Sequence, residues 1–248
     1  MTRPSYVTLD TQQHKDTGIT QDPGFSHARA FNLVTIGFNE IASLSGCMPI
    51  VIVNDTKPEY TLAAVVGMAP FDNLFCGKAQ WLGHAIPLSI QSHPFNYALD
   101  NQSLRVLIND ADERVSQQAT PSTRLFSSDG QPTSLLKHYQ SILSNLVSGQ
   151  QQAKAFIEII ANLNLLTPLS TTLTLQDGQE VVSNDLLTID ETRLAELEKD
   201  TVMELHEQGV LIAIHAMMLS LRQYNRLVQL SQHHENSAVK VSLKLAKD

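Results

Sequence analysis

The sequence predicts an α+β protein, with a small, mostly antiparallel sheet in the N-terminal half and helices plus one β-hairpin in the C-terminal half. Short apolar runs separated by Pro and Gly occupy residues 31–109. Helical spacing of apolar residues dominates after residue 134, and two alternating runs flank Asp177-Gly178. Segregated strands and helices of this kind are typical of an α+β fold.

Length and composition allow a sizeable core. A chain of 248 residues, 42% of them hydrophobic, can form one large domain or two small ones. Its net charge of −8 argues against a broad nucleic-acid surface. Its two cysteines, Cys47 and Cys76, form neither a disulfide framework nor a zinc site, and we interpret them as structural thiols.

Five short strands are expected in the front half. The proline residues Pro70, Pro87 and Pro94 interrupt this region, so long helices are not expected in it. The predicted strands are Pro49–Val53, Tyr60–Met68, Asn73–Phe75, Phe95–Leu99 and Leu104–Asn109.

The polar stretches suggest where domains begin and end. Residues 1–29 are expected to be a flexible arm, or a segment ordered on a partner. A single α+β domain is expected over residues 30–232, with a possible subdomain boundary in the loop at 110–134. Residues 233–248 are expected to form a polar, frayed tail.

Helical spacing in the back half predicts one helix from Leu135 to Val147 and a second from Ala153 to Leu163, with Ser148-Gly149 as the interruption. Pro168 is expected to end the second helix. The alternating runs at 171–176 and 179–183 predict a hairpin with a type I′ turn at Asp177-Gly178.

Asp190 and Asp200 are each expected to cap a short helix. Gly209 is expected in the left-handed conformation, before a long final helix over residues 210–228.

Charge is concentrated in one segment. Residues 176–208 carry ten acidic and two basic residues, while the rest of the chain is neutral. Two interpretations are open, namely a solvated face and an acidic docking surface for a basic partner.

Motifs for phosphate-binding loops, serine hydrolases and zinc proteases are absent from the sequence. No continuous apolar segment marks a secretory signal or a membrane span, because the longest near-apolar run is Val210–Leu221. The expectation is therefore a cytoplasmic protein without a membrane span, with signal-independent export to the cell surface as the alternative.

Polar groups and aromatic rings gather in one Gly- and Pro-rich stretch, which is the candidate ligand-binding site. Asp72, Asn73, Phe75 and Trp81 form either a pocket wall or packed core.

His84, His93 and Phe95 follow in the same stretch, and the two histidines are either ordinary hydrogen-bonded residues or ligands. His215 lies on the apolar stripe of the last helix, as a satisfied core histidine or as a ligand or general base. No catalytic residue, metal ligand or particular cofactor is predicted.

These residues also carry a family resemblance. The series Val66-Gly67, Asn73-Leu74-Phe75, Trp81, Ile86-Pro87 and His93-Pro94-Phe95 resembles the G…NLF…W…IP…YPF pattern of the bacterial SapC family. Further matching positions are Glu40, Ala42, Pro49–Val51, Leu125-Phe126, Asp129-Gly130, Leu165-Leu166, Leu175–Gly178, Leu194, Leu197, Leu205-His206, Gly209, His215 and Leu219–Leu221. The resemblance covers roughly residues 31–230, and it departs from the family at residues 77–80, at Ile90–Ser92 and at His93.

The resemblance implies an association with S-layer loci, from which the family takes its name. It also implies loci for TonB-dependent outer-membrane uptake, with halogenase-like and cupin-like neighbours. It implies no catalytic activity. We therefore expect a non-catalytic accessory or binding protein with a protein or peptide partner.

Two other hypotheses stay open. One is a motif-poor enzyme, or a small-ligand or peptide-binding protein, with its site around residues 72–95. The other is a structural subunit of an S-layer.

Overall fold

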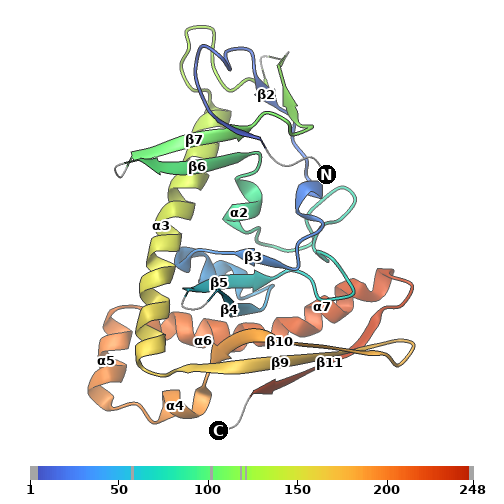
Figure 1. Cartoon of the computed structure of the whole chain (residues 1–248), viewed down its shortest axis with the longest axis vertical. Helices are drawn as coiled ribbons and strands as arrows, with labels where there is room; N and C mark the ends of the chain where they lie inside the picture. The colour runs from blue at the N-terminus through green and yellow to red at the C-terminus, as the bar shows by residue number, and fades with distance from the viewer. Residues whose placement is uncertain (1–4, 57–58, 101–102, 118, 121, 246–248) are drawn as a thin grey trace. The chain divides into compact units, whose positions relative to one another are not determined.

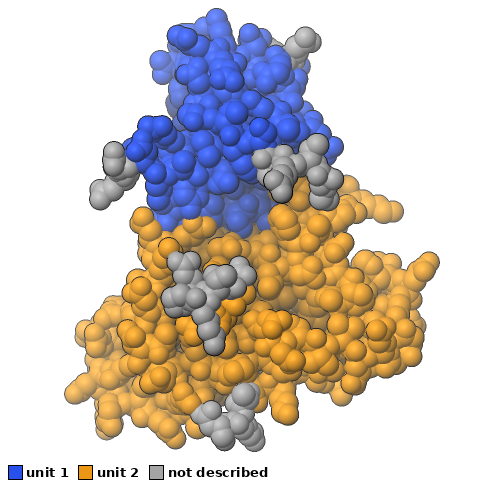
Figure 2. Space-filling view, in the orientation of Figure 1, with its two compact units in different colours: residues 1–23, 88–148 blue, residues 24–87, 149–248 orange. Residues whose placement is uncertain are grey.

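The computed structural model describes residues 5–56, 59–100, 103–117, 119–120 and 122–245. The chain folds into two compact units, and each unit is made of two separate stretches of sequence (Figure 2). Unit 1 contains residues 1–23 and 88–148, and unit 2 contains residues 24–87 and 149–248.

Unit 1 contains a three-stranded antiparallel sheet in the order β1-β7-β6, and a separate pairing of β2 with β8. Its elements are β1 (Tyr6–Thr8), β2 (Gly18–Ile19), α2 (Leu88–Gln91), β6 (Phe95–Asp100), β7 (Ser103–Asn109), β8 (Val115–Ser116) and the first half of α3 (Ser134–Asn162). Strands β6 and β7 lie across the first half of α3 (Figure 1). Apolar side chains from these strands and from α3, including Ile19, Phe95, Ile108 and Leu136, form its core.

Unit 2 contains a six-stranded antiparallel sheet in the order β11-β9-β10-β4-β5-β3 (Figure 1). Its strands are β3 (Leu33–Thr35), β4 (Ile50–Thr56), β5 (Glu59–Val65), β9 (Leu166–Leu175), β10 (Glu180–Ile189) and β11 (Ala238–Leu245). Its helices are α1 (Ile41–Leu44), the second half of α3, α4 (Glu191–Ala195), α5 (Lys199–Glu207), α6 (Val210–Ser220) and α7 (Tyr224–Leu230).

The α+β class is confirmed, but the expected confinement of the sheet to the N-terminal half is wrong. Strands β3 to β5 come from the front half and β9 to β11 from the back half, and β4 pairs with β10 to join them. The physical reason is that a hairpin leaves one row of main-chain donors and acceptors unpaired along each edge. Pairing β4 with β10 satisfies one edge of each hairpin.

Most of the predicted front-half strands are confirmed. Strands β4, β5, β6 and β7 lie where the sequence indicates them, although β5 ends at Val65. The strand expected over Asn73–Phe75 is wrong, because this segment turns and only the next residue, Cys76, forms an isolated bridge, with Trp81.

The predicted hairpin is confirmed, and its turn type is not. Strands β9 and β10 pair antiparallel on either side of residues 176–179. A type I′ turn requires positive φ at both central residues. Only Gly178 has one, at 88°, and the Gly178 N–H donates to the Leu175 carbonyl. The loop is therefore a three-residue turn that ends in a left-handed glycine.

Helix α3 is continuous through Ser148-Gly149, where an interruption is expected from the sequence. Gly149 lies against the main chain of Gly37 and the side chain of Asn39. A Cβ on Gly149 would come within 3.0 Å of Gly37 Cα and 2.8 Å of Asn39 Cγ. The glycine thus marks a close approach of two chain segments rather than a helix end.

Both chain ends differ from the expectation. The described part of residues 1–29 is not a flexible arm, because β1 pairs with β7 and β2 pairs with β8. The segment 233–248, expected as a frayed tail, contains β11, which pairs with β9. The loop at 110–134 lies inside unit 1 and does not separate subdomains.

Helix ends in the back half follow the sequence only in part. Asp190 caps α4 by accepting hydrogen bonds from the N–H groups of Thr192 and Arg193, as expected. Gly209 has the expected left-handed conformation, with φ of 70°. Asp200 is no cap, because α5 already begins at Lys199. The predicted final helix is divided into α6 and α7 by a short 3₁₀ turn. Among the helices in the described part of the chain, none is long and apolar enough to cross a bilayer.

We expect Gly149→Ala to lower the free energy of unfolding by about 1–3 kcal/mol, because the new methyl group would clash with Gly37 and Asn39. Helix propensity alone would instead make the substitution stabilising by roughly 1 kcal/mol. Urea denaturation distinguishes the two signs. Ser144→Ala, an exposed position of the same helix, is the matched control and should change stability by less than about 0.5 kcal/mol.

Candidate functional site

The candidate ligand-binding residues are divided between the two units. Asp72, Asn73, Phe75, Trp81, His84 and His215 belong to unit 2, whereas His93 and Phe95 belong to unit 1. Ligand contact by these residues stays a prediction, and their surroundings are described below for each group.

Trp81 lies in packed interior. Its side chain is stacked on Phe75 with ring centroids 5.4 Å apart, and it meets Phe25 edge-on at 5.8 Å. Only 8% of Trp81 is exposed, and its indole N–H donates to the Ala85 carbonyl at 2.9 Å. The indole donor is therefore already satisfied within the chain.

Asn73 holds the loop that carries these aromatic residues. Its side-chain N–H₂ donates to the Ala28 carbonyl at 3.1 Å, and its side-chain oxygen accepts from the Phe75 N–H at 3.0 Å. Asp72 beside it is exposed. The buried amide therefore fixes main chain from two segments.

The two candidate histidines of unit 2, His84 and His215, are exposed, so the expectation of a core position for His215 is wrong. A ring nitrogen of His84 is 3.2 Å from the Ser43 carbonyl, and His215 Nδ1 is 2.8 Å from the Leu211 carbonyl one turn earlier. The wrong expectation for His215 arises because α6 is apolar on nearly every side, so spacing alone does not identify its inner face.

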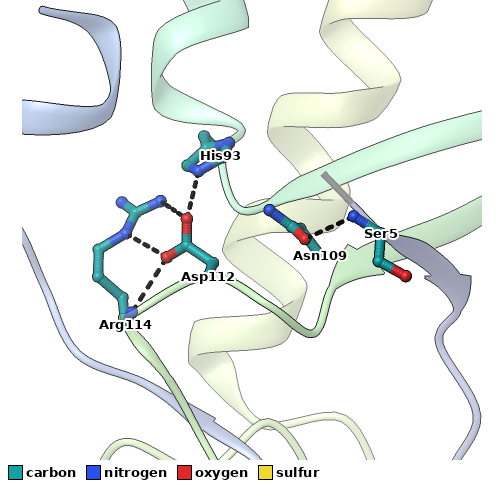
Figure 3. Close-up of polar contacts among 5 residues, drawn as sticks. All are labelled: Ser5, His93, Asn109, Asp112 and Arg114. Atoms are coloured by element: carbon teal, nitrogen blue, oxygen red, sulfur yellow. Dashed lines mark hydrogen bonds and ion pairs between the residues drawn. The ribbon is translucent and has the colours of Figure 1, made fainter. Parts of the chain in front are cut away.

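His93 is part of a polar cluster in unit 1 (Figure 3). Its Nε2 is 2.5 Å from Asp112 Oδ2, and Arg114 Nε donates to Asp112 Oδ1 at 2.9 Å. The Arg114 main-chain N–H donates to the same Oδ1 at 3.1 Å. All three side chains are at most one-fifth exposed. Nearby, the Asn109 side chain accepts from the Ser5 N–H at 3.1 Å and so connects the start of the chain to β7.

Burial and charge act against each other in this cluster. Burial lowers the pKa of His93, and the Arg114 charge lowers it further, against the opposing effect of Asp112. Burial raises the pKa of Asp112, but hydrogen bonds from Arg114 and His93 outweigh it and hold that pKa below its ordinary value. Asp112 is thus an ionised carboxylate already neutralised by Arg114, and His93 stays neutral beside it.

An aspartate that orients a histidine ring is also found in acid–base enzymes. Here the carboxylate is shared with a guanidinium, which favours a fixed structural contact over proton transfer. The sequence analysis found His93 and missed Asp112 and Arg114. The available signal was an Asp-x-Arg spacing directly after β7, where an aspartate can accept hydrogen bonds from the chain two residues on.

A different kind of surface lies on α6. Its inner face packs against α1, β4 and β10, and Ser220 Oγ accepts a hydrogen bond from the Ile50 N–H at 2.8 Å. On the opposite face Ile212 is 75% exposed and Leu219 is 62% exposed, with His215 between them. Positions 212, 215 and 219 share one side of a helix. We call these three residues the outer face of α6.

The comparisons with known proteins identify the family. The sequence profile of SapC matches residues 9–227. The chain belongs to the SapC family. No curated protein and no solved structure matches it. The SapC match runs through parts of both units, from before β2 into α7, and it includes the outer face of α6 while leaving β1 and β11 outside.

Acidic residues are concentrated in the segment that precedes α6. Helix α5 packs against α6. Helices α4 and α5 and the link between them carry the exposed acidic side chains Glu191, Glu196, Glu198, Asp200, Glu204 and Glu207. Met203 on α5 is exposed as well. Helices α5 and α6 thus expose three large apolar side chains, Met203, Ile212 and Leu219, and the segment that precedes α6 is acidic.

We expect acidification to weaken the fold through His93. Its pKa lies below the ordinary value of about 6.5, so between the two pKa values the unfolded chain binds the proton and the folded chain does not. The free energy of unfolding should therefore fall as pH drops below about 6.5. His93→Gln should flatten this slope, and urea denaturation at several pH values measures it. Ser144→Ala, which removes no titratable group, serves as the control and should keep the wild-type slope.

The contribution of Asp112 can be measured separately. Asp112→Asn removes the negative charge that favours the imidazolium form, so an NMR titration should show an even lower pKa for His93. A higher pKa for His93 in this variant would contradict the arrangement described above.

Proposed function

We propose that this SapC family protein is a non-catalytic accessory protein that binds a partner protein through the outer face of α6. The observation that carries the proposal is the exposure of Ile212 and Leu219 on a helix that is apolar on nearly all sides. Helices with this composition are normally buried all round. A partner that covers Ile212 and Leu219 would remove two large apolar side chains from water, each worth about 1.5–3 kcal/mol.

Charge indicates the chemistry of the partner. The exposed acidic residues on α4 and α5 favour a partner segment that combines apolar residues with Lys or Arg. They disfavour a second copy of this chain, whose own acidic helices would approach the same region. We therefore propose a basic, amphipathic segment of another protein as the occupant.

Family membership suggests where that partner is found. The first candidates are the halogenase-like and cupin-like neighbours that the SapC resemblance implies, and the systems are S-layer or TonB-dependent uptake loci. We propose that the complex forms in the cytoplasm.

We expect the double variant Ile212→Asp/Leu219→Asp to weaken partner binding at least about tenfold, since it places charge where apolar contact is needed. The experiment compares affinity purification of the full chain from native cells with purification of the variant. A protein lost with the variant is then purified and its affinity measured by calorimetry.

The matched control is Val239→Asp, because Val239 is exposed to 56% and lies on β11, away from α6 in the sequence. This control should retain the partner. Binding should also weaken when salt is raised from about 0.05 to 0.5 M, since screening reduces the attraction to the acidic helices. Equal recovery of every captured protein by the α6 variant would overturn the proposal, as would a homodimer that the same variant dissociates.

A further inference from the structure

Unit 2 contains a pocket of about 220 Å³ whose lining includes none of the candidate ligand-binding residues. Its walls come from strands in both halves of the six-stranded sheet order. Leu33 of β3 and Val65 of β5 contribute one side, with residues 67–69 after β5, while β9 and β10 contribute the other. Tyr224, the first residue of α7, also lines it.

The pocket is uncharged. Among its lining residues the polar ones are Asn32, Thr171, Ser183 and Tyr224, and none of the others carries a charge or a polar side chain except the thioether of Met68. A carboxylate or an ammonium group placed here would lose its hydration without gaining a counter-charge. The lining therefore selects for an uncharged ligand.

One polar group in the lining has no partner. Tyr224 is 1% exposed, and its hydroxyl has no hydrogen-bond partner among the described residues. Burial raises the pKa of this hydroxyl, so it remains a neutral donor at physiological pH. A buried hydroxyl without a partner is unfavourable, and an acceptor atom that reaches it removes that cost.

The part of the lining formed by Asn32 and Gly67 is held in place by hydrogen bonds within the chain before any ligand binds. The Asn32 carbonyl accepts from the N–H groups of Val66 and Gly67, at 2.8 and 3.1 Å. The Asn32 side chain donates to the Phe71 carbonyl at 2.9 Å. A preformed site does not lose affinity to the ordering of its own wall.

Size limits the ligand further. The pocket is smaller than the roughly 300–1,000 Å³ of sites for drug-sized molecules. Two partly exposed apolar side chains, Leu33 and Val182, lie among its lining residues and can cover a bound apolar molecule. We infer that this pocket binds a small, uncharged, mostly apolar ligand whose oxygen accepts a hydrogen bond from Tyr224. The inference does not depend on the proposed role of α6.

The test uses three monosubstituted benzenes of similar size on the isotope-labelled full chain. Acetophenone has the required oxygen, ethylbenzene lacks it and benzoate replaces the methyl ketone with a charge. Methyl NMR signals of the lining residues Leu173 and Leu186 report binding. We expect saturable shifts with acetophenone, weaker binding of ethylbenzene and none of benzoate. Binding of benzoate as tight as that of acetophenone, or the absence of saturable shifts with acetophenone, would overturn the inference.

Two variants locate the binding site. Tyr224→Phe should weaken the binding of acetophenone by about tenfold, since it removes one hydrogen bond, and should leave the affinity for ethylbenzene unchanged. Val182→Asp should abolish binding of acetophenone, whereas the similarly exposed Val239→Asp on β11 should retain it. Unchanged acetophenone affinity in both pocket variants would overturn the inference.

The ligand-free Tyr224→Phe chain gives an independent readout. Its melting temperature should equal or exceed that of the wild type, because a hydroxyl without a partner contributes nothing to stability. A clearly lower melting temperature would show that the hydroxyl is satisfied within the fold, and would also contradict the inference.

Discussion

The pairing of β4 with β10 is the interaction on which unit 2 depends. It joins a hairpin from residues 50–65 to a hairpin from residues 166–189 through the paired residues Leu186–Val53 and Leu187–Ile52. Helix α6 packs against both strands, and its Ser220 accepts a hydrogen bond from the first residue of β4. Both the uncharged pocket and the position of α6 follow from this short contact, because each uses elements from both hairpins.

The local part of this fold is predictable from the sequence, and the long-range part is not. Alternation around Asp177-Gly178 indicates the β9–β10 hairpin, and Asp190 indicates the start of α4. These signals lie within a few residues of the structure they specify. Strand β10, the second partner of β4, lies more than 130 residues away in the sequence, and nothing in the pattern of residues 50–53 identifies it. The sequence predicts a helix interruption at Gly149 for the same reason, because Gly37, whose close approach requires a glycine there, is distant in sequence.

The same limit applies to the candidate site. The sequence leaves His93 open as a hydrogen-bonded residue or a ligand, and Asp112 and Arg114 join it only through the fold. Trp81 and Phe75 meet as a stacked pair in packed interior, although their sequence context equally fits a pocket wall. His215 is exposed because α6 turns its other side to the sheet, and a helix that is apolar on every side gives no periodic signal for that choice.

The interleaved composition of the two units has a consequence for synthesis on the ribosome. Unit 1 is complete once residue 148 has left the exit tunnel, whereas unit 2 waits for β11, which ends at Leu245. Translation of those 97 intervening residues takes about 5–20 s. During the first part of that interval, until β10 is complete at Ile189, β4 is present without β10, with an open edge on a strand that begins with four apolar residues. Such an edge is a template for pairing with other chains, so the nascent protein is most exposed to aggregation while its first unit is already folded.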